Sequence, residues 1–185
     1  MDTEQRRLRL RVTVKLMFLV LFIGLAYTFL RTLPSSPEVG DTLRYDLSGL
    51  EPGVATRLVW DNKRVILYRR NVAAMDNRER LAEFLLDPQS RHSSQPPFAE
   101  NPYRSLQAQY FVALDYGTDL NCQLDYVNGA QAGPKGVLWL GGLRDRCRGS
   151  WYDDAGRVYK GQQALRNLTI PAYRIEGDTL ILGVE

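Results

Sequence analysis

The apolar positions of this sequence form one long block near the start of the chain and many short blocks after it. The long block runs from Val12 to Leu33 and is interrupted only by Lys15 and Arg31, whose charged ends can reach the membrane surface. About 20 consecutive apolar residues suffice for a helix to cross the hydrocarbon layer of a bilayer. The pattern therefore predicts a single transmembrane helix over residues 12–33, surrounded by the lipid bilayer.

The charges on either side of this block predict its orientation. Residues 1–11 form a basic segment with four arginines, whereas the stretch LPSSPEVGD at the end of the block holds no basic residue. Positive charge favours the cytoplasmic side, so we expect residues 1–11 in the cytoplasm and everything after Pro34 outside. A cleaved signal peptide is the alternative. An uncleaved anchor is favoured because the block is long and no A-x-A site follows it.

The short apolar blocks after the anchor are typical of β-strands. Residues 34–40 are rich in proline, serine and glycine and predict a tether, and residues 41–185 predict one outer domain. The first three blocks, separated by turns at 50–53 and 61–63, indicate a β-meander. The blocks interpreted as strands or as strands with their turns are TLRYDLS (42–48), VATRLVW (54–60), RVILYRR (64–70), QYFVALDY (109–116), GVLWLGG (136–142), DDAGRVYKG (153–161), TIPAYRIEG (169–177) and DTLILGV (178–184).

One segment of the outer domain predicts a short helix. Residues 74–86 place Asp76 and Glu79 at the spacing of a capping box. Their apolar residues Leu81, Phe84 and Leu85 form a stripe on one face of such a helix. The polar, proline-containing residues 87–101 then predict a loop. The fold class is thus mainly β: a small antiparallel β-sheet domain with one short helix, after a single N-terminal transmembrane helix.

Charge excludes nucleic acid as a partner of the outer domain. The whole chain has a formal net charge of +3. The first 33 residues hold six Lys or Arg and two Asp or Glu, which leaves 18 of the 24 basic and 19 of the 21 acidic residues for the remainder. Binding of nucleic acid needs a basic face on the folded domain, which a nearly neutral domain does not predict.

Two short polar segments hold the only two cysteines of the chain. They are GTDLNC (117–122) and DRCRGS (145–150). Iron bridged by sulfide requires thiolate or imidazole ligands, and a chain with two Cys and one His in total is short of them. The one histidine, His92, stands in the polar run SRHSSQPP and is interpreted as a solvated loop residue.

Several longer stretches are similar to the Rieske iron–sulfur subunit family of quinol–cytochrome c reductases. The most specific is the C-terminal run GSWYDDAGRVYKGQQALRNLTIPAYRIEGDTLILG. The stretches YDLSGLEPGVATRLVW, RVILYRR and LLDPQS, together with the N-terminal anchor and hinge, extend the resemblance over nearly the whole chain. The resemblance implies a Rieske-like β domain.

The family holds its cluster in two loops, C-T-H-L-G-C and C-P-C-H-G-S, in each of which one Cys and one His bind iron. In the present chain the resemblance places these four positions at Gly117, Asp119, Asp145 and Arg148. It implies that all four ligands are lost, so we expect neither an iron–sulfur cofactor nor a metal. The second cysteine of each family loop forms a disulfide, which implies a Cys122–Cys147 bridge; two buried free thiols are the alternative.

The residues at the lost ligand positions allow three arrangements. Asp119, Asp145 and Arg148 can form an ion pair, or all three can point into water. A Mg²⁺ or Ca²⁺ site at the two aspartates is the third, and Arg148 would repel its cation. The second loop, LRDRCRGSW, also carries three arginines. Their desolvation would be costly in an apolar pocket, so we expect no docking onto a quinone site.

These observations predict a redox-inert, Rieske-like accessory or structural subunit of a bacterial respiratory membrane complex, either of the cytochrome bc type or a terminal oxidase. It would lie in the cytoplasmic (inner) membrane with its domain in the periplasm, and act by binding membrane subunits of that complex. A free-standing, membrane-tethered periplasmic assembly factor is the alternative. We do not expect an enzyme, because no nucleophile, base and orienting group stand together in the sequence.

Overall fold

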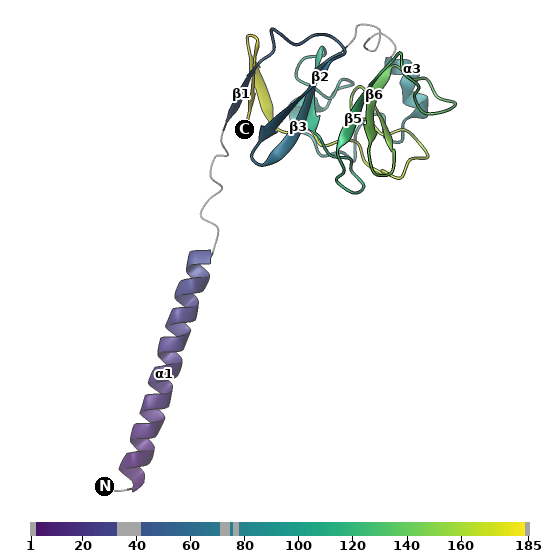
Figure 1. Cartoon of the computed structure of the whole chain (residues 1–185). Helices are drawn as coiled ribbons and strands as arrows, with labels where there is room; N and C mark the ends of the chain where they lie inside the picture. The colour runs from purple at the N-terminus through teal and green to yellow at the C-terminus, as the bar shows by residue number, and fades with distance from the viewer. Residues whose placement is uncertain (1–2, 33–41, 71–74, 76–77, 184–185) are drawn as a thin grey trace. The chain divides into compact units, whose positions relative to one another are not determined.

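The computed structural model describes residues 3–32, 42–70, 75 and 78–183 (Figure 1). The chain divides into two compact units, residues 1–39 and residues 40–185, and each is described by itself. The predicted tether over residues 34–40 lies outside the described residues. The predicted fold class is confirmed: an apolar N-terminal helix accompanies a domain built from small antiparallel sheets.

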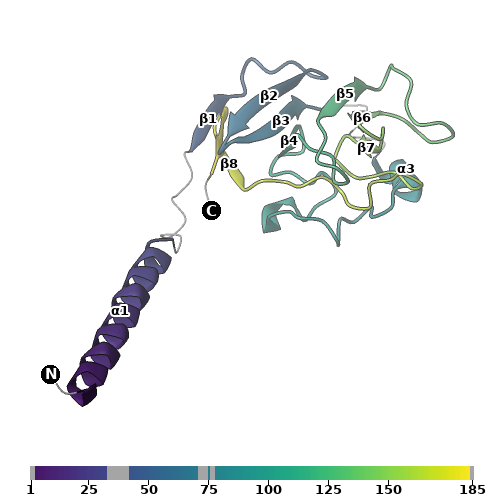
Figure 2. The ribbon, with the colours of Figure 1, turned by 60° about the horizontal axis from the view of Figure 1, so that its bottom comes forward.

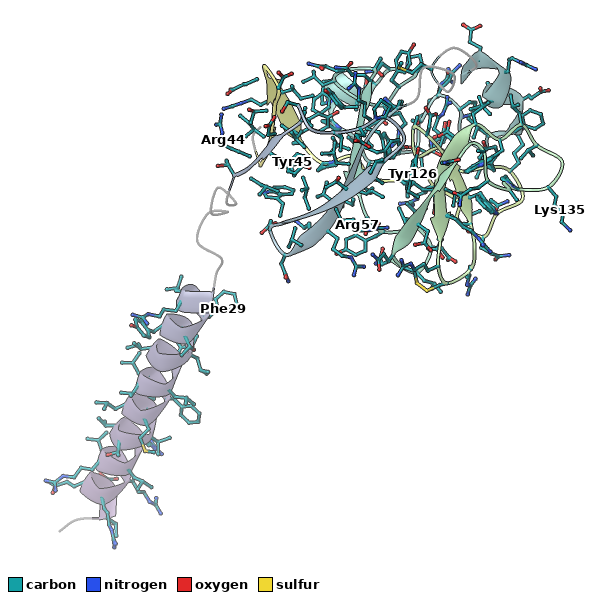
Figure 3. All side chains as sticks on the ribbon, turned by 45° about the horizontal axis from the view of Figure 1, so that its top comes forward. Phe29, Arg44, Tyr45, Arg57, Tyr126 and Lys135 are labelled. Carbon is teal, nitrogen blue, oxygen red and sulfur yellow. A yellow bond between two sulfur atoms is a disulfide. The ribbon has the colours of Figure 1, made fainter. Side chains whose placement is uncertain are left out.

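The first unit is one helix, α1, over Thr3–Thr32. Its side chains, Phe29 among them, project from the helix on all sides (Figure 3). Residues 3–31 are long and apolar enough to cross a membrane, with a mean hydropathy of 2.1 in their most apolar window. The helix begins nine positions before the predicted start at residue 12, because the basic segment is made largely of Arg, Leu and Gln, which favour helix.

The second unit contains three small antiparallel sheets of three strands each among its described residues (Figures 1 and 2). Their orders are β1-β9-β8, β2-β3-β4 and β5-β6-β7. The strands are β1 (Leu43–Asp46), β2 (Ala55–Trp60), β3 (Lys63–Arg69), β4 (Tyr110–Leu114), β5 (Leu124–Asn128), β6 (Gly141–Asp145), β7 (Trp151–Asp153), β8 (Tyr173–Glu176) and β9 (Thr179–Leu182).

The predicted meander is right for its second and third strands and wrong for its first. β2 and β3 form a hairpin in which Trp60 pairs with Lys63. Asp61 and Asn62 between them have φ of 48° and 55°, as the tight turns that suit hairpins require. β1 pairs instead with β9, Leu43 opposite Leu182. This pairing aligns the apolar faces of both strands with the core, where β9 is buried.

The core lies between the sheets, and its centre is formed by β3 and β4. Residues 65–68 of β3 and 111–113 of β4 are almost completely buried. The ring of Tyr68 contacts those of Phe111 and Tyr126, with centroids 5.2 Å and 4.9 Å away. β3 is therefore the buried middle strand of the β2-β3-β4 sheet.

The predicted helix over residues 74–86 is shorter than expected. The described part consists of α3 (Arg78–Leu81) and the 3₁₀ turn η1 (Ala82–Phe84), and Asp76 of the expected capping box lies outside the described residues. The chain becomes extended at Leu85, which forms a β-bridge with Tyr159. A second short 3₁₀ turn, η2 (Pro97–Ala99), lies in the predicted loop. Of the predicted apolar stripe, Leu81 and Leu85 are buried in a small second cluster with Tyr159, and Phe84 packs against it.

Two further strand predictions need correction, and one strand was missed. The block 153–161 contains only Asp153 of β7, while Val158 and Tyr159 form isolated β-bridges. The expected strand over residues 136–142 is strand only at Gly141 and Gly142, where β6 begins. The apolar residues 137–140 pack instead against the second cluster. The strand β5 was not predicted. It brings the two cysteine-containing loops together, because its first residue, Leu124, pairs with the last residue of β6, Asp145.

Candidate functional site

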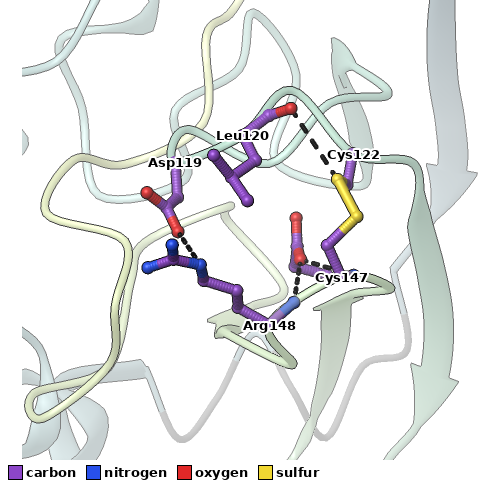
Figure 4. The surroundings of a disulfide bond; sticks show 6 residues. Asp119, Leu120, Cys122, Cys147 and Arg148 are labelled. Carbon is purple, nitrogen blue, oxygen red and sulfur yellow. Dashed lines mark hydrogen bonds and ion pairs between the residues drawn. A yellow bond between two sulfur atoms is a disulfide. The ribbon is translucent and has the colours of Figure 1, made fainter.

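The two cysteine-containing loops lie side by side at one end of the β5-β6-β7 sheet (Figure 4). Loop 1 is residues 115–123, between β4 and β5, and loop 2 is residues 146–150, between β6 and β7. Loop 1 closes on itself, since the Gly117 N–H donates to the Cys122 carbonyl at 2.8 Å. A backbone bond joins the loops: the Arg146 N–H donates to the Gln123 carbonyl at 3.1 Å.

A disulfide between Cys122 and Cys147 joins the loops covalently, as the resemblance implied (Figure 4). The Cα atoms of the two residues are 6.0 Å apart. The alternative of two buried free thiols is therefore wrong. The bridge joins residues at a sequence separation of 25, for which the chain-entropy model gives a stabilisation of about 3.5 kcal/mol.

Asp145, the last residue of β6, turns its carboxylate inward between the loops. The residue is only 3% exposed. Its Oδ1 accepts the backbone N–H of Cys147 at 2.8 Å and that of Arg148 at 2.9 Å. Its Oδ2 faces loop 1, where a Cβ atom on Gly117 would lie only 2.0 Å from it. This Oδ2 is buried and has no hydrogen-bond partner among the described residues.

Asp119 and Arg148 form an ion pair across the two loops. Nε of Arg148 lies 3.3 Å from Oδ2 of Asp119, and their side chains are 49% and 23% exposed (Figure 4). Of the three predicted arrangements, the ion pair is the one observed, but without Asp145. Arg148 reaches Asp145 only through its backbone N–H.

The two aspartates do not form the common cation site considered from the sequence. Among the described residues, the group with metal-like spacing is Cys122, Asp145 and Cys147, whose ligand atoms lie within 4.8 Å of one another. Asp119 is outside this group. Both sulfurs are engaged in the disulfide. His92 is exposed, and its backbone N–H bonds to Asp87.

A buried carboxylate that sequence reasoning missed supports the base of loop 1. Asp115 is completely buried; its Oδ2 lies 3.1 Å from Nε of Arg57 and 3.9 Å from Nε of Arg64. Its Oδ1 accepts the N–H of Leu124 at 3.3 Å, and Arg57 also donates to the Leu124 carbonyl at 2.6 Å. The only signal in the sequence is an acidic residue directly after the apolar run of β4.

A tyrosine from β7 supports the middle of loop 1. The Thr118 N–H donates to the Tyr152 hydroxyl at 3.1 Å. The Thr118 hydroxyl lies 3.2 Å from the Tyr152 hydroxyl and donates to the Arg166 carbonyl at 2.6 Å. Burial raises the pKa of Tyr152, while its hydrogen bonds with Thr118 act in the opposite direction. Tyr152 therefore stays protonated and anchors the loop.

The outer surface of the loops is mixed in character. Arg146 binds Asp125 at 2.6 Å, and Arg144 lies over the ring of Trp151 at 5.1 Å. Leu120 of loop 1 is 53% exposed, an apolar tip residue that the sequence analysis did not single out. The loops thus present guanidinium groups and one apolar side chain to solvent.

Comparison with known proteins agrees with this architecture. No family model matches the chain. The ubiquinol–cytochrome c reductase iron–sulfur subunit of Allochromatium vinosum is 32% identical over 185 aligned positions, which cover 95% of this chain and 88% of the relative. The same subunit of Rhodospirillum rubrum is 34% identical over 138 positions, covering 74% and 67%. The chain therefore belongs to the family of Rieske iron–sulfur subunits of ubiquinol–cytochrome c reductase.

A structure comparison also found a chain of a "Hyperthermophilic respiratory Complex III". It is 16% identical, covers 91% of this chain and 97% of its own length, and superposes with a TM-score of 0.48.

Proposed function

We propose that this protein is a redox-inert, structural subunit of a membrane-bound respiratory complex of the ubiquinol–cytochrome c reductase type. It acts by binding other subunits and carries no electrons itself. The proposal combines membership of the family with the side chains that occupy the two loops. Fold alone would suggest electron transfer, but function depends on the residues of the site.

The relation between Gly117 and Asp145 carries the proposal. The register of the resemblance assigns both positions to cysteine ligands of one iron. Here Gly117 has no side chain, and Oδ2 of Asp145 lies 2.0 Å from where its Cβ would be. A carboxylate held by two backbone N–H groups thus fills the space between these positions.

The other two positions support the same conclusion. A Rieske cluster is bound by two thiolates and two imidazoles. The register assigns the imidazoles to Asp119 and Arg148, which form an ion pair with each other instead. The two cysteines of the chain are joined in a disulfide, and its one histidine, His92, is outside the loops. The residues present do not fit a Rieske cluster.

The anchor and the disulfide support a location in a bacterial cytoplasmic membrane. α1 is long and apolar enough to span the bilayer, and its basic N-terminal end favours the cytoplasmic side. The β domain would then lie in the periplasm, where disulfides persist. A bilayer and the membrane subunits of the complex are the partners that this arrangement requires.

The loop surface supports binding to a polar partner rather than to a quinol pocket. The side chains of Arg146 and Arg148 are 51% and 49% exposed and are paired with Asp125 and Asp119. Burying these pairs in an apolar pocket would cost more desolvation than the exposed Leu120 could offset. Docking onto a quinone site is therefore not part of the proposed function.

Purification of the tagged full-length protein in mild detergent, from cells handled without oxygen, tests the proposal. We expect one-to-one recovery with haem-containing membrane subunits, no stoichiometric iron on this chain, and no Rieske signal from it in electron paramagnetic resonance. Iron and acid-labile sulfide near stoichiometry on the isolated chain would contradict redox inertness. Recovery in clearly substoichiometric amounts would instead identify an assembly factor.

A further inference from the structure

The group formed by Cys122, Cys147 and Asp145 has a chemistry that the oxidised protein does not use. Their ligand atoms lie within 4.8 Å of one another, although the three residues come from two loops. In the disulfide the two sulfurs are poor donors. We propose that reduction of the disulfide creates a binding site for one thiophilic divalent cation of the Zn²⁺ type, with two thiolates and the Asp145 carboxylate as ligands.

The buried carboxylate of Asp145 is the observation that points to a ligand. Its Oδ1 is oriented by the N–H groups of Cys147 and Arg148, and its buried Oδ2 has no hydrogen-bond partner among the described residues. An unpartnered buried carboxylate oxygen is costly, and coordination of a cation satisfies it. Backbone donors that fix the other oxygen are the kind of outer support that ligating carboxylates have in metal sites.

The geometry fits a tetrahedral metal. With Zn–S distances of about 2.3 Å, two sulfurs of a tetrahedral site are about 3.8 Å apart. The Cα atoms of the two cysteines are 6.0 Å apart, so the thiolates can separate by that amount through side-chain rotation. Three protein ligands leave one position for water. Zn²⁺ is favoured over Mg²⁺ or Ca²⁺ because two of the three donors are thiolates.

The charges around the proposed site and its access from solvent are also compatible with a bound divalent cation. Two thiolates, one carboxylate and a divalent cation carry a net charge of −1. Arg148 and Arg146 lie beside the site, and each is already paired with an aspartate outside it, so neither blocks the carboxylate of Asp145. A surface hollow of about 320 Å³ gives the cation a route from solvent. Asp145 and Cys147 line it together with Arg144, Arg146 and Arg148, whose guanidinium groups balance the net negative charge of the filled site.

The redox step needs a reductant, and a dithiol supplies it. One thiolate of the dithiol attacks the sulfur of Cys147, the exposed half of the bridge, and releases the thiolate of Cys122. The second thiol of the reductant then displaces Cys147, so the dithiol becomes a disulfide and the protein gains two electrons and two protons. Binding of the cation releases the two thiol protons. The metal thereby replaces the disulfide as the link between the two loops.

Cobalt is a suitable probe. The full-length protein in mild detergent is reduced with a phosphine under anaerobic conditions and titrated with Co²⁺, followed by competition with Zn²⁺. We expect one Co²⁺ per chain, thiolate-to-cobalt charge-transfer bands, and visible bands of tetrahedral intensity that Zn²⁺ abolishes. The oxidised protein should give none of these. A reduced protein without thiolate–cobalt bands would overturn the proposal.

Two variants separate the proposed ligands from their surroundings. Asp145→Asn keeps the size and one acceptor oxygen but removes the charge, and should weaken Co²⁺ binding more than about tenfold, because loss of outer-shell support alone has that effect. Asp61→Asn is the matched control and should leave the affinity unchanged, since Asp61 lies in the β2–β3 turn, where it pairs with Lys63, and is outside the group. Equal affinity for wild type and Asp145→Asn would refute the assignment of the carboxylate.

A third measurement does not depend on any variant folding. In the reduced wild-type protein, bound Zn²⁺ should slow alkylation of Cys122 and Cys147 together, and a chelator should restore the rate. Alkylation that is indifferent to Zn²⁺ would contradict the site. These outcomes are distinct from those that test redox inertness, because they concern Zn²⁺ and Co²⁺ on reduced thiols and not an iron–sulfur cluster.

Discussion

Oδ2 of Asp145 lies 2.0 Å from the point at which a Cβ atom on Gly117 would stand. The backbone of Gly117 is not in the left-handed region, so its conformation does not require glycine. The space does. The two residues are compatible only because position 117 has no side chain and position 145 has a short one.

Gly117→Ala should therefore destabilise the protein by about 1–3 kcal/mol, the usual cost of overpacking a filled site. Gly49→Ala is the matched control, because an added Cβ there meets no atom within 4 Å, and it should change stability by less than about 0.5 kcal/mol. Denaturant unfolding of the full-length protein in detergent measures both.

A double-mutant cycle tests the origin of this cost. If the clash is with the carboxylate, Gly117→Ala combined with Asp145→Ala should cost less than the sum of the single changes, with a coupling of about 1–2 kcal/mol. Strict additivity would show that the neighbour of Gly117 is not Asp145.

Loss of the disulfide should be more costly than loss of any surface charge in the loops. Cys122→Ser, or reduction in the absence of metal, should reduce the free energy of unfolding by about 2–5 kcal/mol. Thermal unfolding with and without reductant measures it. Unfolding curves that are indifferent to both reductant and Cys122→Ser would mean that the bridge does not form.

The ion pair of Arg148 should contribute little. Both partners are partly exposed, so Arg148→Ala should cost no more than about 1 kcal/mol. Arg57→Ala is the informative comparison, because its partner Asp115 is completely buried, and it should cost about 3 kcal/mol by leaving that carboxylate poorly compensated. An equal loss for the two arginine variants would contradict the assigned difference in burial.

Stability should fall at alkaline pH. Burial is the largest cause that raises the pKa of the buried or half-buried tyrosines Tyr68, Tyr126, Tyr152, Tyr159 and Tyr173. In the unfolded chain these side chains lose their protons near pH 10, whereas in the folded protein they keep them. Above about pH 10 the unfolded state binds fewer protons, so the free energy of unfolding decreases as pH rises.

Denaturant midpoints at about pH 8 and about pH 11 would measure this decrease, with tyrosinate absorbance to follow ionisation. Tyrosines that ionise near pH 10 in the folded protein, with an unchanged midpoint, would contradict the prediction.

Local patterns in the sequence predicted local structure well. The Asp61-Asn62 pair predicted the turn of the β2–β3 hairpin correctly, because Asp and Asn tolerate the positive φ that both turn positions require. The predicted strand over residues 137–140 was wrong. Val, Leu and Trp favour strand by composition, but here they pack against a separate cluster with Leu81 and Leu85. β5 was missed because LDYVN is short and does not alternate cleanly.

The site was predictable only in part. The family register implied the disulfide and located Asp119, Asp145 and Arg148 in the two loops. It could not tell which aspartate pairs with Arg148, because that depends on Asp145 turning inward to accept two backbone N–H groups. Nor could it reveal Asp115, whose importance follows from two arginines far away in the sequence.

The pairing of β1 with β9 has a consequence for how the domain is made. Leu43 and Leu182 are paired in space but lie near opposite ends of the domain's sequence. The sheet that joins them therefore closes a very long loop. During synthesis, β1 emerges early and must wait, with an unpaired edge, until β9 has followed. Sheets with such distant partners form slowly, and an exposed strand edge can pair with the wrong chain. Shortening the chain by the few residues of β9 would therefore leave β1 permanently unpaired, and we expect such a protein to be degraded or to aggregate.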